Sequence, residues 1–371
     1  LVENERKKRG RPPKKENSTI VKELQKTLQT LLKISKSEIQ KPDETVYQRA
    51  IISLDRLHKE FKSVKDVIVK VIDILTHMIS TVIGNGLLDN CHEEDNWEKI
   101  VLDVFLLIEQ IIQDNDSDRE IFGQLCLKPF TQVLMKSTLS IDVRRTIADV
   151  VNALLTGCKE NKKLLSQDNK DCSELVTSII SASDYELQLR YLEILFRLCP
   201  RMQKEREAFA DKAFYAKRDV IPMFFQITAS EFFGDTRRFL NFLNENNDGI
   251  IKTPKTFRVS RVLYNMIILQ IPEGQDCFFV DFNKYTMSTT IKSAEKDETV
   301  ENEVIDIKYF KISSWDIQVN SRENVIRISI SESLRLGDES PSGVNVLSLI
   351  FDSHETHAME SIKKIFANRR V

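Results

Sequence analysis

The sequence lacks the short motifs that hold a reacting group in place. It contains no P-loop, no G-x-G-x-x-G fingerprint, no G-x-S-x-G nucleophile elbow and no H-E-x-x-H pair. Carboxylates are abundant, but they stand in runs such as Glu298–Glu303, which are typical of solvated surface. These absences predict a protein that is not an enzyme and that has no cofactor.

Cysteine and histidine are too scattered to form a metal or disulfide framework. The six cysteines form no C-x-x-C pair, which favours reduced thiols in an intracellular protein. Only His354 and His357 lie close together, without a cysteine or carboxylate cluster, so we expect no metal there. No apolar run reaches the length of a membrane span, and no signal peptide is evident. The chain begins with Leu1 rather than Met, so we expect a piece of a longer protein.

Charge is distributed unevenly along the chain. The net charge is −2, yet residues 1–17 hold seven Lys or Arg and three Glu, a net +4, so residues 18–371 carry −6. Residues 1–17 have almost no apolar content and two adjacent prolines, which predicts a disordered tail. Any affinity for nucleic acid should therefore concentrate in this basic tail.

Within the tail, Arg9-Gly10-Arg11-Pro12 resembles the core of an AT-hook. Gly10 allows close backbone approach, and the two arginines can enter the narrow minor groove of A·T-rich DNA. A generic basic linker or a nuclear localisation signal is the alternative, and either reading implies a nuclear protein. The residues expected to contact DNA are Lys7, Lys8, Arg9, Gly10, Arg11, Pro12, Lys14 and Lys15.

Residues 18–245 show a helical pattern almost throughout. Glycine is sparse, and strand-like alternation is absent. Ser183–Pro200 is the most apolar stretch, with Ser183 and Glu186 spaced as a capping box and Pro200 as a stop. We expect i,i+4 ion pairs from Glu186 to Arg190 and from Glu193 to Arg197. The expected helices span 44–60, 63–84, 95–114, 118–137, 140–156, 171–181, 183–199, 203–213, 219–228 and 231–245.

A weak internal repeat runs through this helical region. The apolar positions around Val104 recur around Ile147 after 43 residues and around Tyr191 after a further 44. Repeats of roughly 40–47 residues are typical of armadillo and HEAT proteins. The repeat predicts an armadillo/HEAT-like α-solenoid over 18–245; an irregular helical bundle with coincidental spacing is the alternative.

After a linker-like stretch at 246–255, the pattern changes to short strands. They are expected at 262–271, 277–283, 285–291, 304–310, 312–319, 324–331 and 344–351. A final amphipathic helix is expected over His354–Arg370. Seven strands and one terminal helix predict a pleckstrin-homology-like β-barrel over 256–371, with the helix capping one end. The fold class is therefore α+β.

Few other features suggest a ligand. The loop 272–276 is acidic, which argues against phosphoinositide binding and a membrane partner. Arg237, Arg238, Arg258 and Arg261 could contact phosphate or an acidic partner, or could be ordinary surface arginines. Ser340-Pro341 is either a phosphorylation site or an unregulated turn.

Three stretches resemble the synaptonemal complex protein 2 family. They are SASDYELQLRYLEILFRLCP, FGDTRRFLN (233–241) and LQIPEGQDCFFVDFNKYTMSTTI (269–291). The family pairs an armadillo-like domain with a domain similar to the middle domain of the FACT histone chaperone. The basic tail departs from the family pattern. The HORMA-binding motif and coiled coil of the family are not visible here.

The resemblance implies a non-catalytic scaffold of the meiotic chromosome axis, the lateral element of the synaptonemal complex. Its expected partners are HORMA-domain, cohesin or centromere proteins, with A·T-rich DNA at the tail and histones as further candidates. It implies a location in the nucleus, on meiotic chromosomes. The alternative is a DNA- or histone-binding chromatin module outside meiosis, similar to FACT or associated with cohesin.

Overall fold

The structure is a computed structural model, and it describes only part of the chain. The described residues are 45, 48, 49, 51, 52, 55, 96–114, 116–166, 169–245, 253–292, 302–334 and 345–369. The basic tail, most of the helices expected before residue 95, and the Ser340-Pro341 turn lie outside this part. The chain divides into two compact units, residues 1–168 and 169–371, and each is described by itself.

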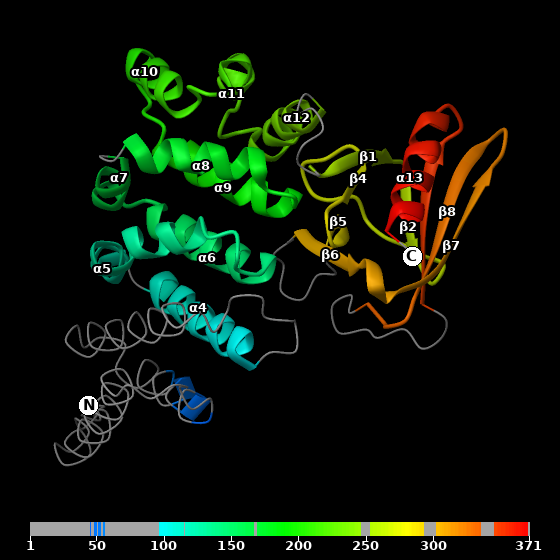
Figure 1. The fold of residues 1–371 in the computed structure, drawn as a ribbon, viewed down its shortest axis with the longest axis horizontal. Helices are drawn as coiled ribbons and strands as arrows, with labels where there is room; N and C mark the ends of the chain where they lie inside the picture. Colours follow the sequence, from blue (N-terminus) through cyan, green and yellow to red (C-terminus); the bar gives the residue numbers. More distant parts are fainter. Residues whose placement is uncertain are drawn as a thin grey trace, which may run out of the picture. The chain divides into compact units, whose positions relative to one another are not determined.

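The described part of the first unit includes four long or medium helices. They are α4 (Asn96–Asp114), α5 (Asp116–Leu134), α6 (Ile141–Leu155) and α7 (Lys159–Ser166), as Figure 1 shows. α6 packs against both α4 and α5. Ser140 caps α6, its hydroxyl accepting a hydrogen bond from the Val143 N–H at 3.2 Å. The predicted helices at 95–114, 118–137 and 140–156 are confirmed to within three residues at each end.

Close packing between α5 and α7 depends on one glycine. Asn161 of α7 is fully buried, and its side-chain amide donates to the backbone carbonyls of Arg119 and Leu154. A Cβ atom at Gly123 of α5 would lie only 2.0 Å from the Asn161 Oδ1 atom. The absence of a side chain at position 123 therefore lets the two helices approach.

The second unit begins with helices. They are α8 (Asn169–Ser181), α9 (Tyr185–Leu198), α10 (Gln203–Ala213), the 3-10 turn η1 (Arg218–Val220), α11 (Ile221–Phe224) and α12 (Phe232–Glu245). α9 packs against α8 and α12. The predicted ion pairs Glu186–Arg190, at 2.9 Å, and Glu193–Arg197, at 2.5 Å, are confirmed.

The predicted cap of α9 is wrong by one residue. The N-cap is Asp184, not Ser183, because the Asp184 carboxylate accepts the hydrogen bond of the Leu187 N–H at 2.9 Å. The helix ends at Leu198, with Cys199 as its C-cap, one residue before Pro200. The repeated positions around Val104, Ile147 and Tyr191 are buried, as a helical repeat requires, except Cys199, which is half-buried. The solenoid itself stays a prediction.

The strands of the second unit form two separate antiparallel sheets. They are β1 (Lys255–Val259), β2 (Arg261–Tyr264), β3 (Ile267–Ile268), β4 (Phe278–Phe282), β5 (Thr286–Lys292), β6 (Asn302–Lys308), β7 (Ile312–Val319), β8 (Glu323–Ile330) and β9 (Asn345–Asp352). One sheet has the order β1-β4-β5-β6, and the other has the order β3-β2-β9-β8-β7.

The predicted closed barrel is therefore wrong: helices precede sheets as expected, but the sheets do not join into one ladder. The chain passes from β6 to β7 through the 3-10 turn η2 (Tyr309–Lys311), so β6 and β7 remain edge strands. The expected strand at 262–271 is a hairpin, β2 and β3, because Asn265 and Met266 have positive φ angles. β1 begins at Lys255, the last residue of the expected linker 246–255, and adds a strand where none was predicted.

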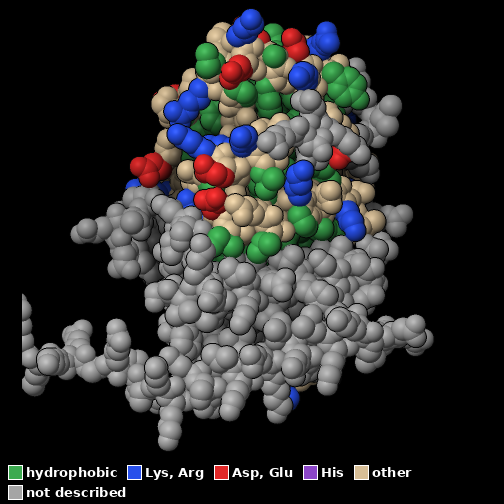
Figure 2. Space-filling model, turned by 90° about the vertical axis from the view of Figure 1, so that its left-hand side faces the viewer, with side chains coloured by type: hydrophobic (Ala, Val, Ile, Leu, Met, Phe, Trp, Pro, Cys, Tyr) green, Lys and Arg blue, Asp and Glu red, His purple; other side chains and the backbone are tan. Residues whose placement is uncertain are grey.

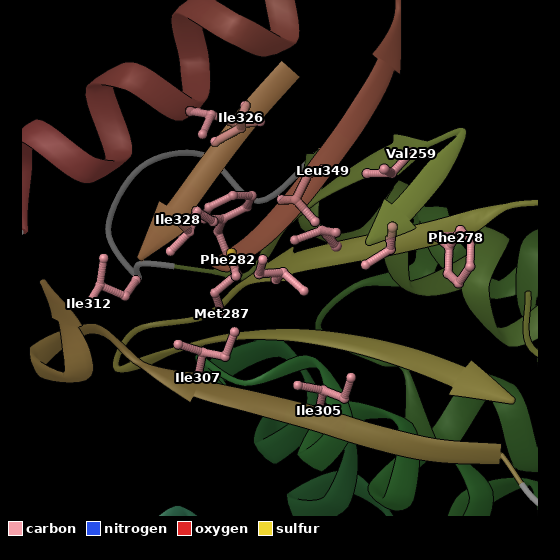
Figure 3. Close-up of a cluster of buried hydrophobic side chains, with 14 of the residues drawn as sticks. Val259, Phe278, Phe282, Met287, Ile305, Ile307, Ile312, Ile326, Ile328 and Leu349 are labelled. Atoms are coloured by element: carbon pink, nitrogen blue, oxygen red, sulfur yellow. The ribbon is translucent and has the colours of Figure 1, made fainter. Parts of the chain in front are cut away.

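The core of this unit lies between the two sheets and the last helix, α13 (Thr356–Asn368). Figure 3 shows Met287, Ile305 and Ile307 of one sheet facing Ile326, Ile328 and Leu349 of the other. Phe366 of α13 enters this core and stacks on Trp315 of β7, with ring centroids 5.1 Å apart. The expected amphipathic helix thus covers the sheets with its apolar face.

Candidate functional site

The DNA-binding residues predicted in the tail lie outside the described residues, so their contact with DNA stays a prediction. The four arginines singled out near the start of the strands are all paired within the chain. Arg237 binds Asp281, Arg238 binds Asp235, Arg258 binds Asp276 at 3.1 Å, and Arg261 binds Glu323. Each arginine thus has an acidic partner within the chain, which disfavours the hypothesis that these four arginines bind phosphate.

A buried ion pair joins helix α12 to the first sheet. The Nη1 atom of Arg237 donates to both carboxylate oxygens of Asp281, in β4, at 2.7 and 2.9 Å. The Thr256 hydroxyl of β1 donates to the same carboxylate at 2.5 Å. The Arg237 guanidinium also lies over the Tyr185 ring of α9, 3.6 Å from its centroid. Arg237 is 7% exposed and Asp281 2%, so water screens this pair little.

A second polar contact ties the start of α9 to the same sheet. The Asn283 Oδ1 atom accepts the Tyr185 N–H at 2.9 Å, one of the helix donors that has no partner within the helix. The side-chain nitrogen of Asn283 donates to the hydroxyls of Thr286 and Ser288. The Lys284 N–H donates to the Ser183 carbonyl at 2.9 Å. We call Tyr185, Arg237, Asp281 and Asn283 the polar junction.

Burial dominates the electrostatics of the polar junction. It raises the pKa of the Asp281 carboxyl, and the Arg237 guanidinium opposes that shift. Burial by itself would lower the pKa of Arg237, but Asp281, together with Tyr185 and Glu186, more than offsets this and keeps that pKa above its usual value. Burial also raises the pKa of the Tyr185 hydroxyl. These groups stabilise the packing of helices on the sheet, and none is exposed to a substrate.

Next to the polar junction, an open groove of about 1180 Å³ lies among α12, β1, the β4–β5 turn and α13. Apolar side chains that line it are buried or half-buried, and we call them its floor: Phe257, Phe282, Ala358 and Ile365. The charged side chains that line it, which we call its rim, are mainly basic. The charged residues that line it are Lys255, Lys284, Lys364, Arg369, Glu245 and Glu355. We call this the basic groove.

The described residues offer no reactive constellation. Among them no group of three or more His, Cys, Asp or Glu could hold a metal ion. No helix in the described part is long and apolar enough to cross a membrane. On the face drawn in Figure 2, basic, acidic and hydrophobic side chains are interspersed among the described residues.

Neither the polar junction nor the basic groove was predicted from the sequence. A signal existed for the junction, since Asp281 stands inside the apolar strand FFVDF, where a lone carboxylate needs a partner. No comparable signal exists for the groove. Its lining comes from segments more than one hundred residues apart in the sequence.

Fold and site together define a class of protein: helices followed by two packed sheets, with a polar junction between them and a basic groove beside it. Residues 13–217 match the family described as "Repeat of unknown function (DUF8079)", and the chain belongs to that family.

The predicted resemblance to synaptonemal complex protein 2 is confirmed. The chain is 24% identical to the Homo sapiens protein of that name over 290 residues, which are 72% of this chain and 18% of that protein. It is 23% identical to the Mus musculus protein over 279 residues, 69% of this chain and 18% of that protein. The chain thus spans less than a fifth of the length of these curated relatives.

A solved structure of a "Synaptonemal complex protein" shares the fold. Its TM-score is 0.60 at 18% identity, and the match covers 92% of this chain and 94% of that one. The three stretches that carried the resemblance meet at the polar junction, because Tyr185, Arg237 and Asn283 each come from a different one. The resemblance therefore coincides with a packing site.

Proposed function

We propose that this chain is a non-catalytic recruitment module of the meiotic chromosome axis, within the lateral element of the synaptonemal complex. The observation that carries the proposal is the similarity to synaptonemal complex protein 2 over about 70% of this chain. In this proposal the armadillo-like helices (18–245) and the pleckstrin-homology-like sheets (256–371), joined by a linker (246–255), bind axis or chromatin-bound proteins. HORMA-domain, cohesin and centromere proteins are the candidate partners.

The test is affinity capture from nuclear extracts of meiotic cells. The whole chain serves as bait, beside a variant with Arg9→Ala and Arg11→Ala. We expect axis, cohesin or centromere proteins on both baits, because the folded part does the recruiting. Capture that depends on the two arginines would assign recruitment to the tail. Absence of every chromatin protein from both baits would contradict the proposed function, including its nuclear location.

A second candidate is a chromatin module outside meiosis that binds DNA or histones. The net +4 of residues 1–17 favours a DNA contact by the AT-hook-like residues. Histones are basic, and residues 18–371 carry −6, which favours a contact with the folded part. Purified histones should then bind the Arg9→Ala/Arg11→Ala chain as well as the unchanged one. If neither chain retains histones, the histone half of this candidate fails.

A further inference from the structure

We infer that the basic groove binds an extended acidic segment of a protein partner, with its carboxylates on the rim and an apolar side chain on the floor. The inference deepens the proposed function and rests on it in one respect, that the segment belongs to a recruited protein.

The rim carries basic side chains that have no acidic partner among the described residues. Lys255, Lys284 and Lys364 are exposed, and no described carboxylate forms an ion pair with them or with Arg369. Four basic and two acidic residues give the lining a net charge of +2. Since residues 18–371 carry −6, the groove is a basic site on an acidic body. Such a site attracts the carboxylates of a partner, whereas the acidic surface elsewhere on the chain repels them.

Two of these cations are held in place. The Lys284 ammonium lies over the Tyr285 ring, 4.6 Å from its centroid. The Arg369 guanidinium donates to the Lys284 carbonyl and lies over the Tyr309 ring at 4.3 Å. A cation fixed in this way loses less side-chain entropy when it binds an anion.

The floor and one edge favour a polypeptide. Phe257 and Ile365 are only partly buried, so an apolar side chain can cover them. β1 is an edge strand, whose outer row of backbone groups can pair with an added strand. The volume exceeds the roughly 300–1,000 Å³ of small-molecule pockets.

Duplex DNA suits the groove less well. Glu245 and Glu355 stand among the lining residues and would repel a backbone that is charged at every phosphate. An acidic peptide can place neutral residues beside these carboxylates, and DNA cannot. DNA is therefore kept as a competing outcome of the test.

The experiment selects peptides from a displayed library of random decapeptides, using the whole chain as bait at physiological salt. We expect the enriched sequences to be rich in Asp and Glu and to contain Leu or Phe. Fluorescence anisotropy then measures the affinity of the most enriched peptide. The charge-reversed chain Lys255→Glu/Lys364→Glu should bind it at least tenfold more weakly.

The matched control is Lys292→Glu/Lys363→Glu. It makes the same change in charge, and Lys363 is exposed beside Lys364 on α13 without lining the groove. Its affinity should stay within twofold, and unchanged thermal melting of both variants shows that they fold. Equal losses in both variants, or no enrichment of acidic peptides, would overturn the inference.

Two further outcomes separate the inference from other conclusions. In the first, an A·T-rich or G·C-rich duplex binds, acidic peptides do not bind, and duplex binding is weakened by Lys255→Glu/Lys364→Glu but not by the control. The groove is then a nucleic-acid site and the inference is wrong. If acidic peptides bind as expected but meiotic extracts yield no chromatin protein, the groove stands and the proposed function fails.

Discussion

At the scale of single residues, the Arg237–Asp281 pair illustrates how a buried charge depends on its partner. Replacing Asp281 by Ala leaves the guanidinium of Arg237 buried without its carboxylate. We expect the free energy of unfolding of the second unit to fall by about 3–5 kcal/mol. Chemical denaturation followed by tryptophan fluorescence measures this change, in a Trp97→Phe background so that only Trp315, which is packed against Phe366, reports.

The double variant Arg237→Met/Asp281→Leu provides the control. It removes both charges and keeps apolar volume, so it should be clearly more stable than Asp281→Ala alone. If the double variant is as unstable as the single one, packing rather than the unpaired charge explains the loss.

Gly123 gives a second prediction for a single residue. A Cβ atom there would overlap Asn161, which is fully buried, so Gly123→Ala should destabilise the first unit by about 1–3 kcal/mol. Gly234→Ala is the matched control, since its Cβ atom would lie 3.8 Å from the Arg238 Nη1 atom. In a helix that change should be neutral or stabilising by up to about 1 kcal/mol. Thermal unfolding by circular dichroism compares them; equal melting temperatures would contradict the prediction.

Cys199 provides a pH-dependent prediction. Burial raises the pKa of its thiol to about 11, although Arg206 opposes the shift. Only the thiolate reacts with iodoacetamide, and at pH 8 about one thiol in a thousand is ionised. Alkylation of Cys199, followed by mass spectrometry, should be slow and should accelerate about tenfold per pH unit up to pH 10. A plateau below pH 9 would show that the pKa is not raised.

At the scale of elements, the N-terminus of α9 is anchored by two side chains. Asp184 caps the helix through the Leu187 N–H, and Asn283 accepts the Tyr185 N–H from outside the helix. We expect Asp184→Ala to lower the free energy of unfolding by about 0.5–2 kcal/mol. Ser183→Ala should change it by less, because Asp184 is the cap. A larger loss for Ser183→Ala in the same denaturation experiment would restore the cap predicted from the sequence.

Helix boundaries were predicted from the sequence more accurately than strand boundaries. The helix 203–213 is observed as predicted, and α4, α6 and α9 agree within two residues, because a helix is decided by neighbours three or four positions apart. The strand expected at 262–271 is instead a hairpin. The turn at Asn265 and Met266 carries no glycine to mark it, although both residues have positive φ angles.

At the scale of the whole molecule, the uneven charge predicts how DNA binding responds to salt. If the tail contacts DNA, binding of an A·T-rich duplex should weaken steeply as salt rises. Arg9→Ala/Arg11→Ala should reduce the slope of log affinity against log salt by about 2, with Lys292→Ala/Lys363→Ala as the control. A gel-shift series at several salt concentrations measures both slopes. An unchanged slope in the tail variant would exclude the AT-hook.

The sequence by itself determined the order of helices before strands, the ion pairs along α9, the amphipathic last helix and the likeness to synaptonemal complex proteins. All of these depend on residues close together in the chain, or on whole stretches compared with relatives. Only the tertiary structure decided that the strands form two sheets and that Arg237 reaches Asp281, 44 positions away. It also brought Lys255, Lys284 and Lys364 to one groove. The physical reason is that long-range pairs are selected by burial and packing of the whole core, which local periodicity does not encode.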